Sequence, residues 1–348
     1  MTTLEWQYGT AYDLFASLYV LHHPKDFGLR KAWAAGVRAR VPEKHRKILE
    51  DLATALPVPF PWVATLPAPQ QASTAIQALE AIPPHRRLPE VFLAPDTPAE
   101  AREIFLRIAR RQTWDEEDLH RIQQAFASHP RPLKKAALRR RLEIWAQADA
   151  FSEALVPALN AYYTVFFAEE EARLEPWLAQ AVQQAQAQAA QQPLETLLVG
   201  LTQGVRLPDA EKVARLILAP SFWFSPLVVF RRLGPDEGLL VFGARPEGAS
   251  LVPGEEVPDA LLLGLRALAD PTRLRILRYL AEGAHTPTQL AKRLRLRAPT
   301  VVHHLHALRL AGLVYLTLEE GEKRYAARTS QVEALYSQLQ AFLRISQD

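Results

Sequence analysis

Basic and histidine side chains gather in one stretch of the chain, between residues 271 and 311. This stretch holds eight Lys or Arg residues, a single acid and four of the ten histidines. The wider segment 259–348 carries 13 Lys and Arg against 8 Asp and Glu, whereas the first 258 residues carry 28 against 30. Clustered positive charge on a small domain is typical of a surface that binds a polyanion. The alternative interpretation is a solvated basic face without a partner. The secondary-structure elements that position these side chains distinguish the two interpretations.

The same segment predicts a run of short helices followed by a β-hairpin. The expected helices are Asp259–Leu268, a second capped at Asp270 and stopped by Gly283, a third that begins at Thr286 and reaches Leu294, and Pro299–Leu310, closed by Gly312; the expected strands are Val314–Leu318 and Lys323–Ala327. Asp and Thr before a proline are typical helix starts, and glycine is a typical stop. Two short helices joined by a tight turn and followed by a hairpin predict a winged helix-turn-helix.

In the helix Pro299–Leu310, a period of 100° per residue places Val301, Leu305 and Leu308 on one apolar stripe. The opposite face of such a helix enters the major groove, where its N-terminal residues meet base edges. We therefore expect the DNA-binding residues to be Arg297, Ala298, Thr300, His303 and His306, with Arg273, Arg293, Arg295 and Lys323 on phosphates and Arg324 beside Lys323 in the wing.

Four spaced motifs in this segment resemble the ArsR-type winged-helix repressors. They are LADPTRLRILRYLAEG (268–283), TPTQLAKRL (286–294), APTVVHHLHALRLAGLV (298–314) and EGEKRYA (320–326). The resemblance covers roughly the last 90 residues and implies a homodimer that binds an inverted-repeat operator in double-stranded DNA. It also implies that the first and last helices of the domain make the dimer contact, here Asp259–Leu268 and Gln331–Ile345, with Leu262, Leu265, Val332, Leu335, Leu339 and Phe342.

The chain departs from the metal-sensing members of that family. Those members carry a Cys pair at the start of the third helix, where this chain has His285-Thr-Pro-Thr288, and residues 331–348 contain no His to serve as a ligand on the last helix. The chain has no cysteine at all, which excludes disulfides, thiolate nucleophiles and Cys-based metal sites. The spacing of His303, His304 and His306 turns at least one ring away from the others. We therefore expect no metal and no cofactor, and we note that Val302 stands where the family usually has Ser.

The rest of the chain predicts a mainly α fold and resembles a subgroup with a large N-terminal helical extension. Residues 1–210 are expected to form a helical effector or oligomerisation domain, 211–245 a small antiparallel β meander packed on it, 246–258 a linker, and 259–348 the DNA-binding and dimerisation domain. The β-branched and aromatic runs Val213–Leu218, Leu227–Leu233 and Leu239–Phe242 are the expected strands of the meander.

These features predict a transcriptional repressor that is not an enzyme. No glycine-rich phosphate loop, nucleophile elbow or zinc-protease motif occurs in the sequence. No apolar run is long enough to span a membrane, so we expect a cytoplasmic protein with no membrane partner. The expected partners are double-stranded DNA, a second copy of the chain and an unidentified small-molecule effector. Two alternatives stay open: the N-terminal part is an enzyme or small-molecule receptor that the winged helix only localises to DNA, or it is a docking scaffold.

Overall fold

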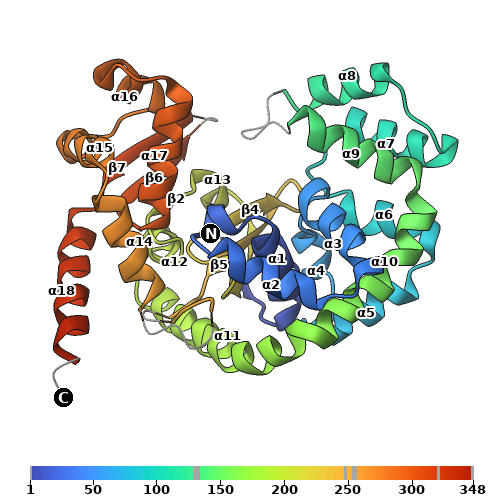
Figure 1. Ribbon diagram of the computed structural model, residues 1–348, viewed down its shortest axis with the longest axis horizontal. Helices are drawn as coiled ribbons and strands as arrows, with labels where there is room; N and C mark the ends of the chain where they lie inside the picture. The colour runs from blue at the N-terminus through green and yellow to red at the C-terminus, as the bar shows by residue number, and fades with distance from the viewer. Residues whose placement is uncertain (1, 128–133, 247–248, 253–256, 320–321, 346–348) are drawn as a thin grey trace. The chain divides into compact units, whose positions relative to one another are not determined.

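The computed structural model describes residues 2–127, 134–246, 249–252, 257–319 and 322–345. The chain forms two compact units, which are built largely from helices and confirm the predicted mainly α fold (Figure 1). Unit 1 comprises Met1–Val182, Val213–Phe224 and Val229–Val241; unit 2 comprises Gln183–Lys212, Ser225–Val228 and Phe242–Asp348. Among the helices of the described residues, none is both long and apolar enough to cross a membrane.

Helix α1 (Thr10–His22) forms the centre of unit 1. It contacts several neighbouring helices and strand β3, and most of its residues are buried, including the polar Thr10, Asp13 and Ser17. The other helical elements that lie in or begin in unit 1 are the short helix η1 (Pro24–Phe27), α2 (Lys31–Arg40), α3 (Glu43–Ala55), α4 (Phe60–Val63), α5 (Ala72–Ala81), α6 (Pro84–Phe92), α7 (Ala99–Arg111), α8 (Glu116–Ala125), α9 (Lys135–Ala146), α10 (Ala148–Tyr162), the π-helical turn η2 (Tyr163–Phe167) and α11 (Ala168–Ala189).

A four-stranded sheet combines a strand from the N-terminal segment of unit 1 with strands from later in the chain. Its strands are β1 (Thr3–Trp6), β3 (Arg215–Ser221), β5 (Glu237–Gly243) and β4 (Val229–Arg232), in that spatial order. Strand β1 runs parallel to β3, and β4 runs antiparallel to β5. The predicted meander is therefore wrong in its order and incomplete, because β5 lies between β3 and β4 and β1 adds a parallel strand. Burial explains the order: β3 and β5 are almost wholly buried, whereas β4, which carries two arginines, is half-buried at the edge.

The carboxylate of Asp13 holds the loop that follows β3. It accepts hydrogen bonds from Oγ of Ser221 at 2.6 Å and from the backbone N–H groups of Phe222 and Trp223 at 3.0 and 2.8 Å. Burial raises the pKa of Asp13 to about 6, and these three donors oppose the rise. The buried carboxylate of Asp13 therefore has a structural role that its hydrogen-bond partners explain.

Unit 2 contains the predicted winged-helix elements in the predicted order. They are α14 (Asp259–Leu268), α15 (Pro271–Glu282), α16 (Pro287–Leu294), α17 (Ala298–Leu310), β6 (Val314–Glu319), β7 (Glu322–Ala327) and α18 (Thr329–Ile345). One apolar core joins α15, α16 and α17 to the hairpin, and it includes Ile276, Leu290, Val301, Leu305 and Leu308. The three residues of the predicted core stripe on α17 are each 0% exposed.

Residues 183–212 belong to unit 2, although the sequence predicts 183–210 as the end of the helical domain and 211–212 as the start of the meander. They form α12 (Leu194–Leu201), β2 (Val205–Arg206) and α13 (Pro208–Glu211). Strand β2 pairs in parallel with β6, so the sheet of the wing has the order β2-β6-β7. The backbone turns into β2 at Gly204, whose φ of +93° and close approach to the ring of Tyr315 require glycine.

A buried and a half-buried arginine fasten this segment to the winged helix. Arg309, in the last turn of α17, is 5% exposed and donates from Nη2 to the carbonyl oxygen of Thr202 at 2.9 Å. Arg328 donates from Nη1 to the carbonyl oxygen of Gln203 at 2.8 Å. Burial lowers the pKa of Arg309 to about 10, and the nearby Arg328 adds to the effect. The C-terminal end of α17 is thereby tied to the residues that precede β2.

Candidate nucleic-acid interface

Helices α16 and α17 are joined by a tight turn whose residues are suited to it. A capping box starts α16, in which Oγ1 of Thr286 accepts from the backbone N–H of Gln289 and the Gln289 side chain accepts from the backbone N–H of Thr286. Arg295 ends α16 in the left-handed conformation, with a φ of +55°. Arg297 occupies the N-cap position of α17 without a side-chain capping hydrogen bond, and Pro299 stands in the first turn, where a missing N–H costs nothing. The turn therefore presents the first residues of α17 outward.

Helix α17 carries four of the ten predicted DNA-binding residues. Thr300 and His303 are exposed, whereas Ala298 and His306 are half-buried. Val302, which the sequence analysis did not include among the DNA-binding residues, is 48% exposed. The outer face is therefore polar with one exposed apolar member, and the opposite face is the buried core stripe.

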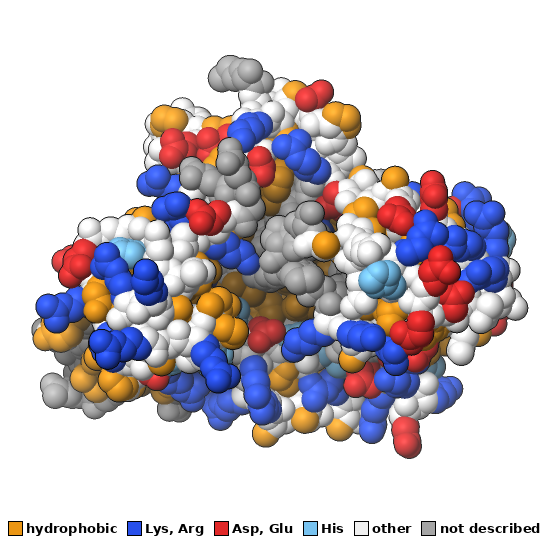
Figure 2. All heavy atoms as spheres, turned by 90° about the horizontal axis from the view of Figure 1, so that it is seen from above, with side chains coloured by type: hydrophobic (Ala, Val, Ile, Leu, Met, Phe, Trp, Pro, Cys, Tyr) orange, Lys and Arg blue, Asp and Glu red, His pale blue; other side chains and the backbone are white. Residues whose placement is uncertain are grey.

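Cationic side chains surround the turn before α17. Arg293, Arg295 and Arg297 are exposed, as is Lys292, which the sequence analysis did not select. The guanidinium of Arg293 lies 5.5 Å from the ring centroid of Tyr279, within the range of a cation–π contact. Blue Lys and Arg side chains are spread among apolar ones over the part of unit 2 that carries α15 and α16 (Figure 2). This arrangement can neutralise the phosphates on either side of a groove.

Arg273 has a different place from the one predicted. Its guanidinium donates from Nε to the carbonyl oxygen of Ala267 at 2.8 Å and from Nη2 to that of Arg266 at 2.6 Å. These oxygens lie at the C-terminal end of α14, where carbonyl groups lack helical partners. Arg273 thus caps a neighbouring helix, and the predicted phosphate contact is not supported. The sequence does not show the carbonyl groups that engage this side chain.

His304 faces the start of α15 rather than the outer surface. Its Nδ1 lies 3.8 Å from a carboxylate oxygen of Asp270. Burial lowers the pKa of His304, although Asp270 partly opposes the shift. The pKa of Asp270 is itself lowered, chiefly because its carboxylate accepts from the backbone N–H of Arg273. In the part of the chain that the structure describes, no three His, Cys, Asp or Glu side chains are grouped so that they could hold a metal ion.

The predicted wing contacts lie on β7. Lys323 is half-buried, and Arg324 is exposed and forms an ion pair with Glu322 at 2.8 Å. Residues 320–321 at the tip of the hairpin lie outside the described residues. An exposed ion pair of this kind is worth little in water, so it leaves Arg324 able to exchange Glu322 for a phosphate.

Helices α14 and α18, whose apolar residues were predicted to make a dimer contact, pack against each other within the chain (Figure 1). Leu335 is buried on Gly264, where an added Cβ atom would lie 2.4 Å from its Cδ1. Leu335 thus serves the intrachain packing rather than an open surface. The other predicted residues are half-buried (Leu262, Leu339 and Phe342) or exposed (Leu265 and Val332, at 38% and 37%).

Two apolar side chains on α18 that the sequence analysis did not select are more exposed than any of these. Tyr336 is 63% exposed and Leu343 is 58% exposed. Together with Leu265 and Val332 they form the α14–α18 face. The sequence alone could have identified both residues. Tyr336 follows Val332, and Leu343 follows Leu339, at the i, i+4 spacing that places residues on one face of a helix.

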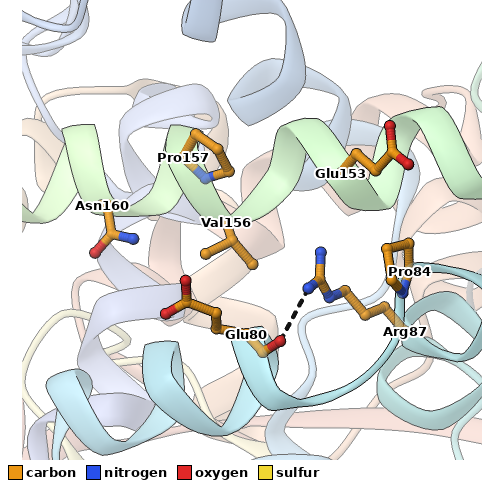
Figure 3. Close-up of a pocket in the computed structure, with 7 residues that line it drawn as sticks. All are labelled: Glu80, Pro84, Arg87, Glu153, Val156, Pro157 and Asn160. Carbon is orange, nitrogen blue, oxygen red and sulfur yellow. Dashed lines mark hydrogen bonds between the residues drawn. The ribbon is translucent and has the colours of Figure 1, made fainter.

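Unit 1 holds an open cavity of about 510 Å³ between α5, α6 and α10 (Figure 3). Its cation, Arg87, is 7% exposed and donates to four backbone carbonyl oxygens at 2.6–3.0 Å. The remaining polar groups of the lining are the carboxylates of Glu80 and Glu153 and the amide of Asn160. A molecule in this cavity would therefore meet two carboxylates and an amide rather than a free cation.

Comparison with known proteins places the similarity in unit 2. A family model described as "Bacterial regulatory protein, arsR family" matches residues 270–315. The HTH-type transcriptional regulator CmtR of Mycobacterium bovis is 45% identical over 84 residues, which are 24% of this chain and 71% of that protein, and CmtR of Mycobacterium tuberculosis gives the same values. A crystal structure of an ArsR family transcriptional regulator aligns at 26% identity over 26% of this chain and 98% of that one, with a TM-score of 0.23.

Proposed function

The chain belongs to the ArsR family of bacterial regulatory proteins, which makes it a DNA-binding transcriptional regulator, and on this premise we propose that it is a repressor that binds an inverted-repeat operator as a homodimer. The observation that carries the proposal is the orientation of α17. Its apolar stripe is buried, its opposite side exposes Thr300 and His303, and exposed cations stand at its N-terminal end. Phosphate contacts would position the helix, and the outer side chains would select the sequence.

The α14–α18 face supports a homodimer. Its exposed apolar side chains lie in one unit with the DNA-facing helix, and exposed apolar patches of this kind are typical of interaction surfaces. A twofold axis through this face would pair the same residues of two copies and present two copies of α17. Such a dimer binds half-sites that are about 34 Å apart, one turn of DNA. The inverted symmetry of the operator follows from the symmetry of the protein.

The chemistry at the start of α16 supports an effector other than a thiolate-bound metal. The chain has no cysteine, and Nδ1 of His285 lies 2.8 Å from the carbonyl oxygen of Gly283. We propose that the protein needs no metal or cofactor for DNA binding, and that regulation comes from the N-terminal part acting as an effector or oligomerisation domain without enzymatic activity. The contacts of Arg309 and Arg328 with the residues before β2 offer a route by which a change in α12 would reach α17.

Selection of bound duplexes from a random DNA library tests the proposal. Full-length protein should enrich an inverted repeat whose half-sites are about one helical turn apart. Sedimentation of the protein with that operator should give two chains per duplex, and deletion of the gene should raise transcription from promoters that carry the motif. A library that converges on no motif would overturn specific recognition. A single half-site would overturn the dimer, and reduced transcription after deletion would overturn the repressor.

A further inference from the structure

Val302 is an apolar side chain on the DNA-facing half of α17. It is 48% exposed, whereas the other apolar residues of the same helix that form its core stripe are 0% exposed. Single exposed apolar residues are common on protein surfaces, so exposure alone carries no inference. The inference about Val302 therefore rests on its position within the outer face of α17.

The period of the helix gives the position of Val302 on the outer face. At 100° per residue, His303 points about 170° away from the centre of the core stripe. Val302 and Thr300 point about 100° away from that centre, on opposite sides. Both of these residues are exposed. The outer face therefore has His303 at its centre, a hydroxyl on one flank and a branched aliphatic group on the other.

The valine side chain restricts which base this flank can contact. It has no hydrogen-bond donor or acceptor, so it would leave the polar edge of guanine, cytosine or adenine dehydrated and unpaired. Thymine alone presents a methyl group in the major groove, at C5. A β-branched side chain in a helix is also held in essentially one rotamer, so its two methyl groups are fixed in direction before DNA binds.

We propose that Val302 selects thymine at one position of each operator half-site by packing against the C5-methyl group. The inference rests on the proposed function, because it assumes that α17 lies in the major groove. It assigns to this chain a base preference that a serine at the same position would not produce. Transfer of one methyl-sized group from water corresponds to about a fourfold change in affinity, and two half-sites give about 16-fold.

Replacement of thymine by deoxyuridine in the selected operator tests this proposal, because uracil lacks only the C5-methyl group. Symmetric replacements, one position at a time, should identify one thymine per half-site whose change weakens binding about 16-fold. The variant Val302→Ser should bind the thymine and uracil operators equally at that position. Leu274→Ala is the matched control, since Leu274 is 49% exposed on α15, outside the outer face of α17. It should keep the full preference for thymine.

The outcomes separate this inference from the function on which it rests. A wild-type protein that binds its operator but shows no uracil effect at any position would overturn the role of Val302 and leave the regulator intact. A thymine preference that survives in Val302→Ser would overturn it equally. Failure to select any operator would contradict the proposed function itself. Circular dichroism of both variants should match the wild type, because neither side chain belongs to the core.

Discussion

Replacing Arg295 with glutamine should flatten the salt dependence of operator binding. Four exposed cations stand between the end of α16 and the start of α17, namely Lys292, Arg293, Arg295 and Arg297. If each neutralises one phosphate, a dimer neutralises about eight, and log K should fall with log salt at a slope of about −7. Affinity would then fall about 10⁴-fold between 50 and 200 mM salt.

The variant Arg295→Gln removes two of these contacts per dimer. Its slope should be about −5.4, so its affinity should fall about 10³-fold over the same salt range. Glutamine removes the charge and shortens the side chain but keeps it polar, and residue 295 is exposed, with a left-handed backbone that strains either residue. The change should therefore affect phosphate contacts rather than folding. Fluorescence anisotropy with labelled operator at four salt concentrations measures both slopes.

Arg273→Gln is the matched control for this prediction. The guanidinium of Arg273 is engaged by the carbonyl oxygens of Arg266 and Ala267, so its removal should leave the slope at the wild-type value. It should instead lower the free energy of unfolding by about 1 kcal/mol, because the partly buried carbonyl oxygen of Ala267 loses its donor. An unchanged slope for Arg295→Gln together with a flattened slope for Arg273→Gln would refute the assignment of cations made here.

Three further predictions concern stability and assembly. In urea unfolding, Gly9→Ala should lower the free energy of unfolding by about 3 kcal/mol, because the new Cβ atom would lie 2.1 Å from the Gln70 carbonyl oxygen. Gly36→Ala should raise it by about 0.5–1 kcal/mol, because no atom lies within 4 Å of the new Cβ atom. Equal effects of the two variants would contradict the packing around Gly9. Burial lowers the pKa of His22 to about 4 from 6.5, so stability is full above pH 6.5 and declines as the pH falls towards 4. Between pH 7 and 4.5, the free energy of unfolding should therefore fall by about 2 kcal/mol more in the wild type than in His22→Gln. If the two proteins lose stability in parallel over this pH range, His22 is excluded as the cause. Tyr336→Glu on the α14–α18 face should shift the sedimentation of the free protein from dimer to monomer, and an unchanged dimer would place the interface elsewhere.

The winged helix could be predicted because each of its elements carries local start and stop residues. Asp270 and Thr286 cap helices through their own side chains, as their placement before proline predicts. The apolar spacing of α17 likewise determines which side is buried. These are interactions among near neighbours in the chain, and composition and order are sufficient to specify them.

The remainder depends on contacts between distant residues, which no local pattern specifies. Strand β2 has two residues and pairs with β6 more than a hundred positions later. Ser221 meets Asp13 across 208 positions, and this contact anchors the loop after β3. Arg273 was predicted to bind phosphate because the sequence does not distinguish an arginine that is exposed to water from one that donates hydrogen bonds to carbonyl groups. Burial and partners, rather than residue type, decide such roles.

The specificity ratio of the full-length protein shows whether the outer face of α17 reads DNA sequence. Competition titrations at 150 mM salt should compare the selected operator with a scrambled duplex of equal length, for the wild type and for the double variant Thr300→Ala, His303→Ala. The wild-type ratio should be about 10³ or more. For the variant the ratio should fall to about 16, the share that Val302 supplies in two half-sites, while its affinity for the scrambled duplex stays unchanged because its phosphate contacts remain. A wild-type ratio near one, or a variant that retains the full ratio, would contradict sequence recognition by the outer face of α17.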